Sequence, residues 1–181
     1  MNTVPIHDKQ FSLFIPSEKI QERIEELAAQ INLDYKNEIP LFISVLNGAF
    51  LFTADLLKKI TLDCQVFFIK LTSYQGTQSS GIVKNIIGLN EEILNRKIII
   101  LEDIVDSGNT VVHLLKEIEK HHPSEIKIAS LLLKPTALKH DVKIDYLGFE
   151  VPDDFLVGYG LDYNGLGRNL NDIYKQQQSK R

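Results

Sequence analysis

The chain has 181 residues, a length that favours a single domain, 1–181, whose core is large enough to need no disulfide or metal for stability. Apolar residues make up 44% and charged residues 24% of the composition, as in an ordinary soluble globular protein. The net charge of −4 gives no sign of a surface for nucleic acid or membranes, and the lone cysteine, Cys64, excludes an internal disulfide.

The most apolar long stretch, residues 41–57, is interrupted by polar residues such as Asn47 and Asp55, so it does not predict a membrane span. The first ten residues, MNTVPIHDKQ, lack the apolar segment of a secretory signal. We therefore expect a cytoplasmic protein, in agreement with a reducing compartment for Cys64.

The first elements alternate between helix and strand. Apolar residues recur at helical spacing from Ile20 to Ile31, with Ser17 as the expected N-cap. An apolar strand over 41–46 breaks at Asn47-Gly48, and a helix then continues to about residue 60. A second strand is expected over 64–71.

A stretch rich in Ser, Thr, Gln and Gly follows and predicts a mobile loop with short strand edges over about 72–85. Strand 97–105 (KIIILEDIV) contains the apolar run IIIL, which is typical of a strand covered on both faces, and a helix follows over 111–118. Further strands are expected over 126–133, 145–151 and 155–161, and a frayed tail over about 176–181. Strands alternating with helices predict an α/β fold with a mostly parallel sheet.

The segment ILEDIVDSGNT (100–110) carries the clearest functional signal. Its small-residue turn opens a helix, where Ser107, Gly108, Asn109 and Thr110 expose backbone N–H groups. These donors and the helix dipole favour an anion, and Gly108 permits its close approach. A turn of this kind at the carboxyl end of a parallel strand is where ligands bind in open α/β sheets.

Three carboxylates, Glu102, Asp103 and Asp106, come together at the end of this strand. They repel each other unless a cation or hydroxyl groups occupy the space between them. An anion turn beside an acidic patch suits a sugar phosphate, with ribose hydroxyls and Mg²⁺ on the acids. The alternative is that Asp106 only caps the helix while the acidic pair faces solvent, but the full pattern on an apolar strand favours the sugar phosphate.

The same segment resembles the signature for 5-phosphoribosyl-1-pyrophosphate binding in type I phosphoribosyltransferases, and similarity to their hypoxanthine-guanine branch covers about residues 10–174. The matching segments are 44–56 for the pyrophosphate loop, 71–76 for the flexible loop with its Ser73-Tyr74 pair, and 131–170 for the purine site. The resemblance implies a central sheet flanked by helices, with a small hood formed by N- and C-terminal segments.

The activity implied is purine salvage: transfer of the phosphoribosyl group to N9 of hypoxanthine or guanine, giving IMP or GMP and pyrophosphate, with Mg²⁺.

The resemblance also implies roles for single residues. On the purine side, Asp106 is implied as general acid/base at N7, Lys134 as the donor to O6, Phe155 as the ring that stacks on the base, and Leu156 as a source of backbone contacts. On the sugar side, Glu102 and Asp103 hold the ribose and metal, and the 5′-phosphate lies in the turn of Asp106, Ser107, Gly108, Asn109 and Thr110. Asp162 is implied as a further metal ligand close to the purine, and Asn47, Gly48 and Arg168 are implied at pyrophosphate.

Two positions depart from the family pattern. Asn47 stands where many members carry Lys, so the backbone N–H groups around Gly48 are expected to bind pyrophosphate, and the family's non-proline cis peptide is expected at Leu46–Asn47. Asn109 replaces the basic residue common in the phosphate turn, which works mainly through backbone donors.

Two other classes of protein fit less well. A sensor of the phosphorylated sugar that binds nucleic acid needs a basic face, which the charge of −4 does not predict. A phospho-acceptor receiver domain places its acidic pair after the first strand, near the N-terminus, rather than at Glu102-Asp103. The sequence leaves open the preference among hypoxanthine, guanine and xanthine, and the choice between homodimer and homotetramer that the family implies.

Overall fold

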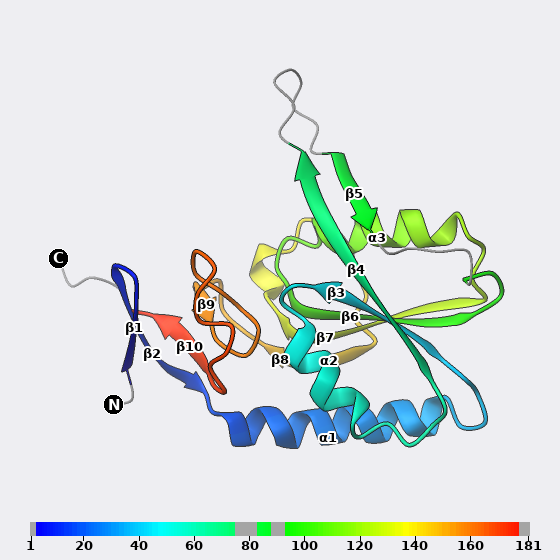
Figure 1. Cartoon of the computed structure of the whole chain (residues 1–181), viewed down its shortest axis with the longest axis horizontal. Coiled ribbons are helices and arrows are strands. Elements are labelled where there is room, and N and C mark those ends of the chain that lie inside the picture. The colour runs from blue at the N-terminus through cyan, green and yellow to red at the C-terminus, as the bar shows by residue number, and fades with distance from the viewer. Residues whose placement is uncertain (1–2, 75–82, 88–92, 178–181) are drawn as a thin grey trace.

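The computed structural model describes residues 3–74, 83–87 and 93–177 (Figure 1). Within these ranges the main sheet has six strands in the order β5-β4-β3-β6-β7-β8. They are β3 (Leu41–Leu46), β4 (Gln65–Tyr74), β5 (Val83–Ile87), β6 (Lys97–Val105), β7 (Glu125–Leu133) and β8 (Tyr146–Glu150). Neighbours pair in parallel except β4 and β5, which are antiparallel, so the mostly parallel sheet is confirmed.

Helices cover both faces of this sheet, as Figure 1 shows: α1 (Ser17–Asp34) and α2 (Phe50–Leu57) lie on one side and α3 (Asn109–Glu119) on the other. Alternate strand residues face the two layers. Ile99 and Leu101 of β6 join the core with α1, whereas Ile98 and Ile100 join the core with α3. None of the described helices combines the length and apolar content needed to cross a membrane.

The hood is a second, antiparallel sheet in the order β1-β2-β10-β9, built from both ends of the chain (Figure 1). Its strands are β1 (Thr3–Ile6), β2 (Lys9–Ile15), β9 (Leu156–Val157) and β10 (Ile173–Gln176). A separate small core of Ile6, Phe11, Val157 and Tyr174 holds it together. Gln177 donates its N–H to the Gln10 carbonyl at 2.9 Å, so ordered pairing extends into the stretch expected to be frayed from about 176.

Ser17 is not the N-cap of α1, because the helix already includes it and Pro16 occupies the capping position. The Ser17 N–H instead donates to Asp172 Oδ1 at 2.7 Å, so a carboxylate from the far end of the chain satisfies this helix end. Local sequence patterns cannot predict a cap from a residue so distant in the sequence.

The strand expected over 155–161 is too long, since β9 contains only Leu156 and Val157. Tyr159 has a φ of 48°, and its two neighbours, Gly158 and Gly160, each have a φ of 98°. Left-handed backbone of this kind ends a strand and turns the chain. The turn carries the next residues toward the main sheet.

Candidate active site

The phosphate turn lies between β6 and α3. Gly108 has a φ of 79° and takes the N-cap position of α3, so the turn requires the left-handed backbone that glycine adopts without strain. The first turn of the helix begins at Asn109, and the N-terminal end of a helix favours an anion. The sequence prediction of a turn at a helix N-terminus is therefore correct in its local geometry.

A segment after β7 covers the same turn. The Lys139 N–H donates to the Ser107 carbonyl at 3.0 Å, and a Cβ at Gly108 would lie 3.2 Å from Val142 Cγ2. His140 Nε2 lies 2.7 Å from Asn109 Oδ1, which places an imidazole beside the residue that departs from the family pattern. No local pattern predicted His140 in this position.

Two cavities meet at the carboxyl end of β6. The first, the hood-side cavity, has a volume of about 350 Å³ and is lined by eight of the predicted site residues: Gly48, Asp103, Asp106, Lys134, Phe155, Leu156, Asp162 and Arg168. The second, the sheet-side cavity, has a volume of about 330 Å³ and includes Glu102, Asp103 and Thr110. Asp103 lines both cavities, so the acids of β6 stand where the two spaces adjoin.

The turn after β3 packs tightly against this acidic end. The Leu46–Asn47 peptide is cis, as the family resemblance implied, and Asn47 is exposed. A Cβ at Gly48 would lie 1.6 Å from Asp103 Oδ2, and a Cβ at Gly160 would lie 2.0 Å from the Gly48 carbonyl oxygen. Gly48 is therefore held between the acidic strand end and the hood, with no room for a side chain.

Asp103 is an acid of β6 whose pKa is changed by burial. Burial raises the pKa of its carboxyl to about 6, although backbone hydrogen bonds and the charge of Arg168 act in the opposite direction. Glu102, its neighbour, is buried with 4% of its surface exposed.

Asp162 and Arg168 form an ion pair on the hood side of the cavity. Arg168 Nη2 lies 2.6 Å from Asp162 Oδ1, and Arg168 Nη1 donates to the Gly160 carbonyl at 2.6 Å. The Gly165 N–H donates to Asp162 Oδ2 at 2.7 Å. Arginine carries five N–H donors, so further donors remain to contact a ligand.

Lys134 lies at the end of β7 and is buried, with 8% of its surface exposed. Its Nζ lies 3.2 Å from Asp106 Oδ2 and 3.2 Å from Asp153 Oδ1. Both partners are largely open to solvent, at 53% and 63% of their side-chain surface. The bridge to Asp106 joins two predicted purine contacts, while Asp153 was not predicted.

Phe155 is not a core residue, since 43% of its surface is exposed and it lines the hood-side cavity. Its ring meets that of Tyr163 edge to face at 5.6 Å between centroids, and Phe11 lies 6.2 Å away. Lys9 Nζ stands 5.1 Å from the centre of the Phe155 ring. Sequence patterns did not predict these neighbours. The hood brings Lys9 and Phe11 to Phe155 from a distant part of the chain, and Tyr163 follows the turn after β9.

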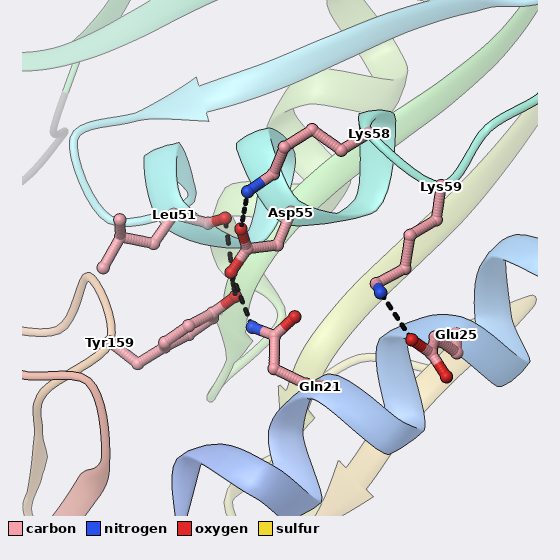
Figure 2. A network of polar contacts seen from close by, with 7 residues as sticks. All are labelled: Gln21, Glu25, Leu51, Asp55, Lys58, Lys59 and Tyr159. Carbon is pink, nitrogen blue, oxygen red and sulfur yellow. Dashed lines mark hydrogen bonds and ion pairs between the residues drawn. The ribbon is translucent and has the colours of Figure 1, made fainter.

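Figure 2 shows how the hood is tied to the helix that follows the Asn47-Gly48 turn. The Tyr159 hydroxyl donates to Asp55 Oδ2 at 2.6 Å, and Gln21 Nε2 donates to the same oxygen at 2.7 Å. Lys58 Nζ lies 2.6 Å from Asp55 Oδ1. Burial alone acts to raise the pKa of Asp55, but these hydrogen bonds outweigh it and lower that pKa.

We expect Tyr159→Phe to lower the free energy of unfolding by about 1–2 kcal/mol, because the change removes a buried hydrogen bond to a carboxylate. Urea unfolding of the two proteins would measure it. Tyr163→Phe is the matched control, since its hydroxyl donates to Asp8 at the surface, and it should change stability little. Equal losses in both variants would contradict a specific role for the Asp55 network.

The flexible-loop prediction falls largely outside the described residues. The backbone of Ser73 and Tyr74 forms the end of β4, where they pair with Lys84 and Val83 of β5. Residues 75–82 lie outside the described ranges.

Comparisons with known proteins agree with this arrangement. The phosphoribosyl transferase domain family matches residues 16–164. The chain is 44% identical over 165 residues to a hypoxanthine-guanine phosphoribosyltransferase of Bacillus subtilis, covering 91% of each chain. It is 40% identical over 169 residues to the protein of the same name from Mycobacterium bovis, covering 90% of this chain and 84% of the relative.

Solved structures give the same result. A crystal structure of a hypoxanthine-guanine phosphoribosyltransferase from Bacillus anthracis matches with a TM-score of 0.83 and 37% identity, covering 91% of this chain and 97% of that one. The fold, the cavities at the end of β6 and these relatives agree. The chain therefore belongs to the phosphoribosyl transferase family, in its hypoxanthine-guanine branch.

Proposed function

We propose that the chain transfers the phosphoribosyl group of 5-phosphoribosyl-1-pyrophosphate to N9 of hypoxanthine or guanine, giving IMP or GMP and pyrophosphate. The observation that carries this proposal is the hood-side cavity, where Asp106, Lys134 and Phe155 stand together beside the phosphate turn. An acid, a buried cation and an aromatic face are the groups that a planar 6-oxopurine needs.

On the purine side, Lys134 donates to O6 and Phe155 stacks on the ring, while Leu156 gives backbone contacts. Asp106 lies 3.2 Å from Lys134 Nζ, which supports one purine edge reaching both groups, with N7 at Asp106 and O6 at Lys134. The half-exposed Phe155 ring supports stacking, because a side chain committed to the core has no free face.

On the sugar side, Glu102 and Asp103 hold the ribose hydroxyls, and the backbone of residues 106–110 holds the 5′-phosphate. The left-handed Gly108 and the start of α3 support the phosphate site. Asn47, Gly48 and Arg168 bind pyrophosphate. The contact between Gly48 and Asp103 supports a leaving group that is bound next to the ribose.

Mg²⁺ is the proposed cofactor, and Glu102, Asp103 and Asp162 would hold it either directly or through water. The described residues form no group of three or more His, Cys, Asp or Glu side chains that would hold a metal by themselves. This arrangement suits Mg²⁺, which commonly takes one or two carboxylates and completes its shell with water and substrate phosphates. When bound, the ion neutralises charge on the departing pyrophosphate.

In the reaction, N9 forms a bond to C1 of the ribose as the C1–oxygen bond to pyrophosphate breaks, and pyrophosphate leaves with the electron pair. Asp106 accepts the N7 proton as N9 becomes nucleophilic. The transition state resembles an oxocarbenium ion, so catalysis depends on positioning and on fixed charges near the leaving group. Water has to be kept from the activated sugar, because it would otherwise hydrolyse it.

The test is product analysis with each 6-oxopurine. Purified protein supplied with the phosphorylated sugar and Mg²⁺ should form nucleotide and pyrophosphate in equal amounts from hypoxanthine and from guanine. Xanthine as a third base would establish the preference that the sequence leaves open. Release of pyrophosphate without nucleotide, or no reaction with any of the three, would contradict the proposed activity.

We further propose a homodimer or homotetramer that works in the cytoplasm. Exposed apolar side chains support subunit contacts: Phe50 at the start of α2 is 37% exposed and Phe68 on β4 is 45% exposed. Sedimentation over a range of protein concentrations distinguishes a monomer from either assembly.

A further inference from the structure

Lys134 is held by two carboxylates, of which the proposed reaction uses only one. Asp106 is the proposed general acid/base, whereas Asp153 lies 3.2 Å from the same ammonium and does not line the hood-side cavity. The ammonium is the buried member of the group, since Lys134 exposes 9% of its side chain and the two acids expose more than half of theirs.

The backbone explains why Asp153 is in reach. The Lys134 N–H donates to the Val105 carbonyl at 2.9 Å, so the lysine starts from the end of β7 beside the phosphate turn. Asp153 belongs to the short link between β8 and β9, two residues before Phe155. The Val151 N–H donates to the Leu133 carbonyl at 2.8 Å and anchors this link to β7, next to Lys134.

We propose that Asp153 is a positioning residue for the 6-oxopurine, which keeps the Lys134 ammonium at the O6 position when Asp106 turns to N7 of the base. This inference rests on the proposed roles of Lys134 and Asp106. A buried ammonium needs a partner at every stage of the reaction, because its removal from water is costly when it is unpaired. Asp153 supplies that partner without competing for the purine.

The same contact joins the two walls of the purine site. Asp106 belongs to the main sheet, and Asp153 is continuous with the segment that carries Phe155. Lys134 therefore links the segment that carries Phe155 to the segment that carries Asp106. Loss of Asp153 would leave Lys134 paired with Asp106 alone and draw the ammonium away from O6.

The experiment compares Asp153→Asn with Asp154→Asn, which changes the neighbouring acid. Asp154 pairs with Lys175 at 3.2 Å and has no contact with Lys134, so it is a matched control. We expect Asp153→Asn to raise KM for hypoxanthine about fivefold, a value kept modest because Asp153 is largely exposed. KM for the phosphorylated sugar should stay within about twofold. Asp153→Glu, which restores the charge, should recover most of the loss.

A double-mutant cycle separates positioning from general destabilisation. If Asp153 acts through Lys134, then Lys134→Met combined with Asp153→Asn should match Lys134→Met alone, since the first change already removes the ammonium. Additive effects, an equal KM rise in Asp154→Asn, or no KM change in Asp153→Asn would overturn the inference. Intact hypoxanthine kinetics in Lys134→Met would instead contradict the proposed purine contact itself.

Discussion

Adenine is expected to be rejected by about 10⁴-fold or more in kcat/KM relative to hypoxanthine and guanine. Lys134 donates to O6, whereas adenine carries an amino group at that position. The amino group would set donor against donor and leave a buried ammonium poorly satisfied. Parallel assays of nucleotide formation with the three bases would measure this ratio, and efficient use of adenine would contradict the 6-oxopurine assignment.

Lys134→Met tests the same contact from the protein side, since methionine keeps the approximate length and removes the charged donor. We expect kcat/KM for hypoxanthine to fall by about 10- to 100-fold, the loss of one hydrogen bond to a charged group. KM for the phosphorylated sugar should change little, because that substrate is held by residues 102–110. A fall of equal size for both substrates would indicate a collapsed site rather than a lost purine contact.

Removal of Mg²⁺ is expected to abolish activity, and added Mg²⁺ should restore it. Pyrophosphate leaves as a multi-anion, and Asn47 supplies no charge in the turn proposed to bind it. Arg168 is already paired with Asp162, so the fixed positive charge nearby is partly neutralised. Turnover would be followed in chelator and then across a Mg²⁺ titration, and full activity in chelator would contradict the metal role.

Asp162→Asn is the matched variant for this prediction, because it keeps the shape of the side chain and the acceptor for the Gly165 N–H. It should raise the Mg²⁺ concentration needed for half-maximal activity more than it alters KM for the purine. A change in purine KM alone would instead place Asp162 on the base.

Local patterns in the sequence were sufficient for most of the main sheet, although the end of β4 and the start of β5 lie in the stretch expected to be a loop. The apolar run of β6 and the glycine turn before α3 obey short-range rules, and both lie where those rules put them. Contacts between distant residues were beyond such rules. The cap of Ser17 comes from Asp172, and the neighbours of Phe155 include Phe11.

In the candidate site, too, local patterns predicted some residues but not those placed by contacts between distant segments. The acids of β6 could be located by spacing alone, because one strand delivers them to one edge. Asp153 and Tyr159 could not be located in this way, because each contacts a residue of another segment, Lys134 and Asp55 respectively. A single aspartate or tyrosine can have many structural roles, and only its contacts in the folded protein show which role it has.

The hood also has a consequence for the order in which the protein is made. β2 pairs with β10, in a register that sets Phe11 opposite Gln176, so β2 is synthesised long before its partner strand. The main sheet closes over shorter separations and can form during translation, because loop-closure entropy favours nearer partners. We expect released chains that stop before β10 to fold the main sheet but to lack a competent purine site. Nucleotide binding is therefore expected only in chains that include β10.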